Sequence, residues 1–154
     1  MSAAGWNARL DEVQAAILRL KLPLLDGWIS RRRDHARAYD EALARAGLVR
    51  PFEAPGVSHA YHQYVIQVDN RDAVRAELAR QGIETGVQYP IPCHLQEACR
   101  GLGYGAGSLP ETERCTGRIL SLPVYPELTE EQRAYVAASL LDVVTERAVE
   151  EQRV

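Results

Sequence analysis

The feature that most constrains the fold is a helical pattern that begins in "GWNARLDEVQAAILRLKL", residues 5–22, and reaches Leu24. Apolar side chains recur there at steps of three and four residues, which places them on one face of an α-helix. These positions are Leu10, Val13, Ile17, Leu20 and Leu24. Because an apolar stripe of this kind is stable only when other structure covers it, the pattern indicates an amphipathic helix that packs against a larger body.

The start of this helix has favourable residues. Asn7 is a good N-cap, and Asp11 and Glu12 are expected in the first turn, where negative charge suits the helix dipole. A helix N-terminus also attracts phosphate or carboxylate groups, and Asn7 adds an amide donor. From the residues alone, two interpretations remain: Asn7 caps its own helix, or it contacts an anion.

The helical pattern is interrupted once. Pro23 lacks an N–H group and disfavours the α conformation before it, so it should kink or break the helix. The pattern then resumes and is expected to end at Gly47, a plausible C′ glycine. We expect Arg31, Arg32 and Arg33 to form a solvated face of this second helix.

Composition narrows the class of protein. The 154 residues fit one domain, with 46% hydrophobic and 25% charged residues, as in a globular protein. A net charge of -3 and the lack of a long apolar run argue against nucleic-acid and membrane partners. The start "MSAAGWN" does not resemble a signal peptide, so we expect a cytoplasmic protein.

Two residue types restrict the chemistry. Cys93, Cys99 and Cys115 follow no zinc spacing, so reduced thiols are expected and no metal site is assigned. Of the 18 basic residues, Lys21 is the one lysine. Lysine-based catalysis is therefore restricted to a single candidate side chain.

The middle of the chain predicts an α/β fold. "YHQYVIQV" (61–68) is rich in β-branched and aromatic residues and predicts a strand. A helix capped by Asp69 or Asn70 is expected to end at Gly82, and "IETGVQYPIP" (83–92) predicts a second strand. This strand–helix–strand unit indicates a small sheet with helices packed on it.

The last third predicts more helices. A short helix is expected over 94–103, another over 111–120, and an extended piece over 121–128. Thr129 is a good N-cap for the last helix. Its buried face is predicted to comprise Tyr135, Val136, Ala138, Leu140 and Val143.

Two further segments combine polar groups with a restricted backbone. In "SHAYHQY", His59 and His62 could bind a metal, but no third ligand is near, so structural packing is the preferred interpretation. In "GVQYPIPCHLQ" (86–96), two prolines make a stiff loop that could present Tyr89 and His94 to a ligand. Cys93 precedes His94, but adjacent side chains on an extended chain point apart, which argues against a thiol–imidazole dyad.

Four segments, in order, resemble a known family. The first helical segment is similar to "G-Y-N-x-R-L-D-E-x-Q-A-A-x-L" followed by "R-R-x-x-A-x-x-Y"; "YHQYVIQV", "GIETGVQYPIPCHLQ" and "LSLPVYPELTEEQ" match further segments. The family is the DegT/DnrJ/StrS group of sugar aminotransferases, which use pyridoxal 5′-phosphate (PLP). The resemblance covers nearly the whole chain. It implies the C-terminal α/β (α+β) domain of a fold-type I enzyme, with a long N-terminal helix, a small sheet and flanking helices.

The resemblance also implies roles for individual residues. Family members transfer an amino group, usually from glutamate, to a nucleotide-linked keto-sugar, at active sites between the subunits of a dimer. The asparagine that matches Asn7 contacts the PLP phosphate in the partner subunit. The loop with Tyr89 and His94 matches a segment that borders the substrate pocket, so both are candidate substrate-binding residues. The family often has histidine in place of Gln88 and an aliphatic residue in place of Cys93, so substrate contacts are expected to differ in detail.

The family's large N-terminal domain, which holds PLP and provides the Schiff-base lysine, has no counterpart in this sequence. Lys21 lies in a helix that the family uses for packing, so we assign no catalytic residue. We expect a connecting helical segment (1–50), a small α/β domain (51–148) and a frayed tail (149–154).

The resulting prediction is the C-terminal portion of a PLP-dependent sugar-nucleotide aminotransferase, inactive in isolation. It would work as a homodimer or with a separately encoded N-terminal half. The alternative is a non-catalytic dimerisation or binding module on the same scaffold. A third reading, a Cys/His redox or metal protein, predicts bound zinc or iron. Because the first helix would normally pack on the missing domain, we expect exposed apolar surface and self-association.

Overall fold

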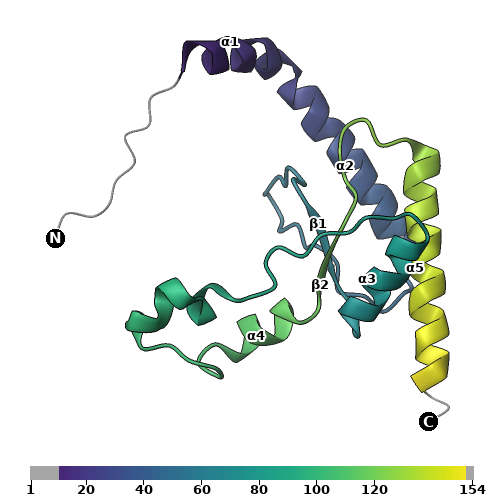
Figure 1. Ribbon diagram of the computed structural model, residues 1–154. Helices are drawn as coiled ribbons and strands as arrows, with labels where there is room; N and C mark the ends of the chain where they lie inside the picture. The colour runs from purple at the N-terminus through teal and green to yellow at the C-terminus, as the bar shows by residue number, and fades with distance from the viewer. Residues whose placement is uncertain (1–10, 152–154) are drawn as a thin grey trace.

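Figure 1 shows the computed structural model, in which residues 11–151 are described, with side chains as far as residue 146. A bent pair of helices leads into a small body of sheet and helices, and an arm extends from the sheet. In chain order, the elements are α1 (Glu12–Lys21), η1 (Leu22–Leu24), α2 (Leu25–Ala42), β1 (Tyr64–Gln67), α3 (Arg71–Arg80), η2 (Cys93–Leu95), η3 (Glu97–Leu102), α4 (Pro110–Thr116), β2 (Ile119–Leu122) and α5 (Glu130–Glu151). The three η elements are 3₁₀ helices.

Helix α1 begins later than the sequence predicted. Asp11 has an extended backbone and its carboxylate accepts a hydrogen bond from the Val13 N–H at 2.9 Å. Asp11 is therefore the N-cap of α1 and does not lie in its first turn, because a short carboxylate competes well for the unpaired N–H groups of a helix start. Asn7, the predicted cap, lies outside the described residues.

The break at Pro23 is confirmed. The chain tightens into the 3₁₀ helix η1, which has Pro23 in its first turn, and then continues as α2 in a new direction (Figure 1). Helix α2 ends at Ala42, earlier than the predicted Gly47. Leu43 is fully buried there, and Gly47 takes a φ of +69° in the turn that follows.

The sheet pairs different segments from those predicted. Strands β1 and β2 are antiparallel, with Tyr64 opposite Leu122 and Gln67 opposite Ile119. The expected strand over 83–92 contributes one isolated bridge, between Gly86 and Ser121. Its two prolines lack the N–H groups that a longer ladder requires. Strand β2 instead includes the end of the segment 111–120, which was predicted as helix.

The last helix starts as predicted, at a capping box. The Gln132 N–H donates to Thr129 Oγ1 at 3.1 Å, and the Thr129 N–H donates to Gln132 Oε1 at 3.0 Å. Helix α5 packs against α2 and α3. Its buried face includes Ala137 in place of Ala138, and Tyr135 is 52% exposed.

The core lies between the sheet and the helices. Its fully buried large side chains are Tyr39, Leu43, Tyr64, Ile66, Val74, Leu78, Leu120 and Leu140. Helix α1 contributes no buried residue. The predicted exposed apolar surface on the first helix is thereby confirmed, since Leu20 is 78% and Ile17 47% exposed.

Candidate functional site

The segment that carries Tyr89 and His94 projects from the body (Figure 1). We call residues 87–118 the arm; it contains η2, η3 and α4. The arm leaves the sheet just after the Gly86–Ser121 bridge and returns to it at Ile119. Both predicted substrate-binding residues therefore lie in one excursion of the chain, whose two ends are adjacent in the sheet.

Tyr89 and His94 have different surroundings. Tyr89 is 69% exposed, whereas the ring of His94 is buried. His94 Nε2 lies 3.1 Å from Glu113 Oε1, at the first turns of α4. The ring of Tyr104 meets His94 edge-on, with centroids 6.4 Å apart. His94 is thus part of the internal structure of the arm, and Tyr89 is the residue that offers a ring to a ligand.

Glu113 is a residue that sequence reasoning missed. Both of its carboxylate oxygens accept from the Gly107 N–H, at 2.9 and 3.0 Å, and Oε1 also accepts from the Leu109 N–H at 3.3 Å. The hydrogen bond from the Gly107 N–H, followed by those from His94 and Leu109, holds the pKa of Glu113 below its usual value. An acidic residue early in a short helix is common, so the sequence held no distinctive signal for it.

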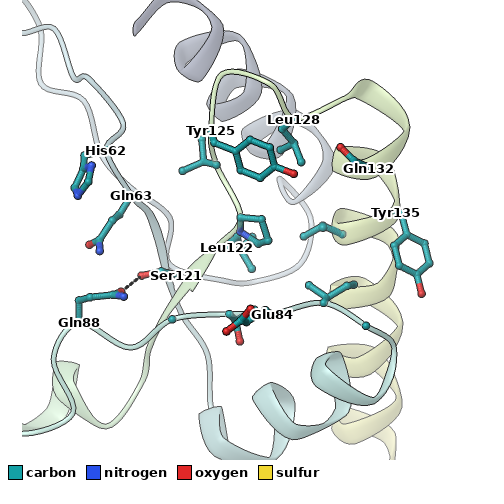
Figure 2. Close-up of a pocket in the computed structure, with 17 residues that line it drawn as sticks. His62, Gln63, Glu84, Gln88, Ser121, Leu122, Tyr125, Leu128, Gln132 and Tyr135 are labelled. Carbon is teal, nitrogen blue, oxygen red and sulfur yellow. Dashed lines mark hydrogen bonds between the residues drawn. The ribbon is translucent and has the colours of Figure 1, made fainter. Parts of the chain in front are cut away.

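A second feature is a cavity of about 580 Å³ between the sheet and α5 (Figure 2). Gln88 and Ser121 form one wall, with the Ser121 hydroxyl donating to Gln88 Oε1 at 2.7 Å. Glycine at position 86 matters here, because a Cβ would lie 2.5 Å from Gln88 Nε2. The missing side chain at Gly86 leaves room for the Gln88 amide to lie against the backbone at the cavity edge.

The chemistry of this cavity suits uncharged groups. No arginine or lysine lines it, and its one carboxylate belongs to Glu84. Tyr125 and Leu128 lie on the side nearest α5 in Figure 2, and the Tyr135 hydroxyl donates to the Gln81 carbonyl at 3.0 Å. Amides, hydroxyls and aromatic rings are typical of sites for hydroxylated ligands, whereas phosphate groups prefer cationic side chains.

The two histidines of "SHAYHQY" have different surroundings. His59 Nδ1 accepts from the Tyr61 N–H at 2.8 Å and the two rings are in contact, so His59 has the structural role that was preferred. His62 is exposed and lines the cavity. Among the described residues, no group of three histidine, cysteine or acidic side chains could hold a metal ion.

The three cysteines are free thiols, and Cys93 is exposed. The neighbouring His94 directs Nε2 to Glu113, which leaves the Cys93–His94 pair without a hydrogen bond in the described structure.

The arginine run on α2 is partly structural, contrary to the prediction of a solvated face. Arg32 Nη1 donates to the carbonyls of Tyr61, His62 and Val124, at 3.2, 3.2 and 2.7 Å. Arg33 Nε donates to the His59 carbonyl at 2.9 Å. These two side chains join α2 to the loops beside both strands, which a helical pattern cannot reveal.

Two hollows among the described residues can be compared with the needs of PLP chemistry, which uses a lysine and an acidic partner. Lys21 lines an apolar groove between α1 and α2, beside Leu18, Arg19 and Trp28. No carboxylate lines this groove to pair with the pyridine nitrogen of PLP, and no lysine lines the cavity of Figure 2. A bound PLP would supply the electron sink for amino transfer, and neither of these two hollows combines a lysine with a carboxylate to hold it.

Solved structures define the class of protein. S. venezuelae DesV, in complex with a ketimine intermediate, superimposes with a TM-score of 0.87 at 37% identity, covering 92% of this chain and 38% of that chain. A DegT DnrJ EryC1 StrS aminotransferase from Brucella abortus gives 0.80 at 38% identity, covering 88% of this chain and 36% of its own. The fold is that of part of an aminotransferase, as predicted.

The particular family follows from the sequence match. The family model described as DegT/DnrJ/EryC1/StrS aminotransferase matches residues 1–141. The chain belongs to this family, whose aminotransferases are PLP-dependent. The predicted family is thereby confirmed.

Curated relatives share this similarity along most of the chain. A pleiotropic regulatory protein of Geobacillus stearothermophilus is 48% identical over 90% of this chain. A dTDP-3-amino-3,4,6-trideoxy-alpha-D-glucose transaminase of Streptomyces venezuelae is 39% identical over 94% of the chain. The chain spans 38% and 37% of the length of these two relatives.

No helix among the described residues is both long and apolar enough to cross a bilayer.

Proposed function

We propose that this chain is the C-terminal part of a PLP-dependent sugar-nucleotide aminotransferase. The reaction would move an amino group from an amino acid such as glutamate to a nucleotide-linked keto-sugar, in the cytoplasm. The observation that carries the proposal is the match to S. venezuelae DesV, which covers 92% of this chain at a TM-score of 0.87. Relatives named as transaminases of dTDP- and UDP-linked sugars support the substrate class.

The parts of the chain receive different roles in this proposal. Residues 1–50 connect to a cofactor domain, and residues 51–148 form the small domain. Tyr89 and His94 are assigned to substrate binding through the arm. Asn7, outside the described residues, is assigned to the PLP phosphate of the partner subunit in a dimer.

We propose further that the isolated chain does not transaminate. The support is chemical: amino transfer needs a lysine beside the cofactor, and Lys21 lies in an apolar groove without an acidic partner. An apolar groove of about 560 Å³ instead suits contact with another polypeptide. This groove also favours the alternative function, a non-catalytic dimerisation or binding module.

The first experiment titrates the purified chain with PLP and follows the absorbance of the cofactor. We expect no stoichiometric band shift, and no difference between the wild type and Lys21→Ala. A stoichiometric shift that Lys21→Ala abolishes would show that the chain carries its own catalytic lysine. Arg19→Ala, which removes the other cation of the groove, is the matched control for loss of charge.

The second experiment separates the enzyme from the module. The chain is co-expressed with the remaining N-terminal part of the Streptomyces venezuelae transaminase, and release of 2-oxoglutarate from glutamate is measured with a dTDP-linked keto-sugar. We expect activity with both parts and none with either alone. A stable complex without activity would favour the binding module.

A further inference from the structure

The arm lacks a hydrophobic core of its own. In the described chain, the buried apolar cluster has no member between Ile83 and Leu120, and Val87, where the arm begins, packs against it. Several large apolar side chains of the arm are exposed, among them Ile91, at 54%, and Leu102, at 68%. Because little apolar surface is buried there, the conformation of the arm depends on its polar contacts.

One carboxylate joins three parts of the arm. Glu113, on α4, accepts from the Gly107 and Leu109 N–H groups of the preceding loop and from His94 of η2. In sequence, His94 lies 19 residues from Glu113. Other hydrogen bonds within the arm are more local, such as Gly105 N–H to Ser108 Oγ at 3.0 Å. Glu113 is thus the contact that folds η2 and the loop onto α4.

The Glu113 carboxylate also determines which nitrogen of the His94 ring carries the proton. A carboxylate oxygen that already receives backbone N–H groups acts as an acceptor, so Nε2 of His94 must carry the proton. Nδ1 is then the nitrogen with a lone pair. Among the described residues, no hydrogen bond to Nδ1 accompanies the one from Nε2 to Glu113.

We propose that Glu113 is a positioning residue. It fixes His94 in the Nε2–H tautomer and holds the loop 105–109 against η2, so that the arm keeps the conformation in which it presents Tyr89 to substrate. The contact between the arm and substrate rests on the proposed function. The effect of Glu113 on the order of the arm and on the His94 tautomer is tested on the chain itself.

The test compares Glu113→Ala and Glu113→Gln with Glu111→Ala. Glu111 lies on the same helix but is exposed, and its side chain pairs with Arg114, so it is the matched control. The ¹⁵N chemical shifts of the His94 ring report its tautomer at about pH 8. The rate of trypsin cleavage after Arg100, whose side chain is 79% exposed in η3, reports the order of the arm.

We expect Glu113→Ala to shift His94 to a mixture of tautomers and to speed cleavage after Arg100 by about tenfold, because three N–H groups lose their acceptor. Cleavage outside the arm and the signals of β1 and β2 should not change. Glu111→Ala should match the wild type. If Glu113→Ala fails to fold, Glu113→Gln decides: a neutral amide weakens the contacts and should speed cleavage by about threefold.

A wild-type tautomer and a wild-type cleavage rate in the folded Glu113 variants would overturn the proposal. In the two-part enzyme described above, Glu113→Gln should raise KM for the keto-sugar several-fold and leave kcat within about twofold, as expected for lost uniform binding. An unchanged KM would overturn the link to substrate. If the two-part enzyme shows no activity at all, the proposed function fails. The tautomer and cleavage measurements on the chain would still test whether Glu113 orders the arm.

Discussion

Single charged residues satisfy backbone groups that no helix or strand satisfies. Glu113 accepts from two loop N–H groups, and Arg71 Nη1 donates to the carbonyls of Thr116 and Ile119, at 3.4 and 3.1 Å. Arg71 is nearly buried and also contacts Asp72 at 2.6 Å. Glu113 thus acts within the arm, and Arg71 holds the end at which the arm returns to β2.

At this scale, His35 predicts a pH dependence of stability. Burial, followed by the positive charge of Arg133 at 3.5 Å, lowers the pKa of His35 below its ordinary value of 6.5; Arg31 acts in the same direction, against Asp34 and the Pro126 carbonyl. Below pH 6.5 the unfolded chain therefore binds more protons than the folded one. Stability is complete above this value and is lost as the pH falls toward the folded pKa.

We expect the free energy of unfolding to decrease below pH 6.5, with a slope from His35 of at most about 1.4 kcal/mol per pH unit. Urea denaturation at a series of pH values measures it. His35→Gln should flatten this part of the profile, and His62→Gln is the matched exposed control. An unchanged slope in His35→Gln would contradict the assignment. Protonation of Glu113 decreases the free energy of unfolding only at more acidic pH, because the hydrogen bonds to its carboxylate hold its pKa below the ordinary value of 4.5.

At the scale of elements, a few side chains join helices to strands. Arg32 connects α2 to the loops that flank both strands, and the Tyr39 hydroxyl of α2 donates to the Pro123 carbonyl at 3.0 Å. The Tyr64 hydroxyl of β1 donates to Asp40 at 2.7 Å, and burial followed by this contact raises the pKa of Tyr64. The sheet of two strands is thus fastened to α2 by polar contacts as well as by packing.

Arg32→Met tests this fastening. The change leaves three carbonyls without their cationic donor, and hydrogen bonds to charged groups contribute more than neutral ones, so we expect a loss of about 2 kcal/mol in the free energy of unfolding. Urea denaturation measures it. Arg31→Met removes a neighbouring exposed arginine and should stay within about 0.5 kcal/mol of the wild type. Equal losses in the free energy of unfolding for the two variants would show that the hydrogen bonds of Arg32 do not stabilise the fold.

At the scale of the whole molecule, the apolar surface of α1 and η1 lies open. The groove between α1 and α2 is lined by Leu18, Leu22, Leu25 and Trp28, and the first two are 55% and 68% exposed. A contiguous apolar surface of this kind is typical of an interface. In the proposed enzyme it would contact the cofactor domain or another subunit.

We therefore expect the isolated chain to self-associate through this groove. Leu18→Glu combined with Leu22→Glu should lower the average mass in sedimentation velocity, because charges desolvated in an apolar contact are unfavourable. Phe52→Glu, at a loop side chain that is 83% exposed, is the control and should associate as the wild type does. A monomeric wild type at micromolar concentration, or association that persists in the double variant, would contradict the expectation.

Signals contained within a few residues predicted the local structure well. The break at Pro23, the cap at Thr129 and the end of α3 near Gly82, which has a φ of +78°, were all read from single residues. The family was recognised from four ordered segments, and the match over residues 1–141 confirms it. Each of these signals acts within one helical turn or one short motif, so tertiary structure was not needed to read it.

The tertiary structure alone decided the pairing of strands and the organisation of the arm. Strand β1 pairs with Ile119–Leu122 across more than fifty residues, while the nearer segment 83–92 makes one bridge. Likewise, Arg32 and Glu113 meet partners far along the chain. The sequence by itself determined the break at Pro23, the cap at Thr129 and the family. Which distant groups meet depends on how the whole chain closes around its core, because hydrogen bonds between remote residues have no local pattern.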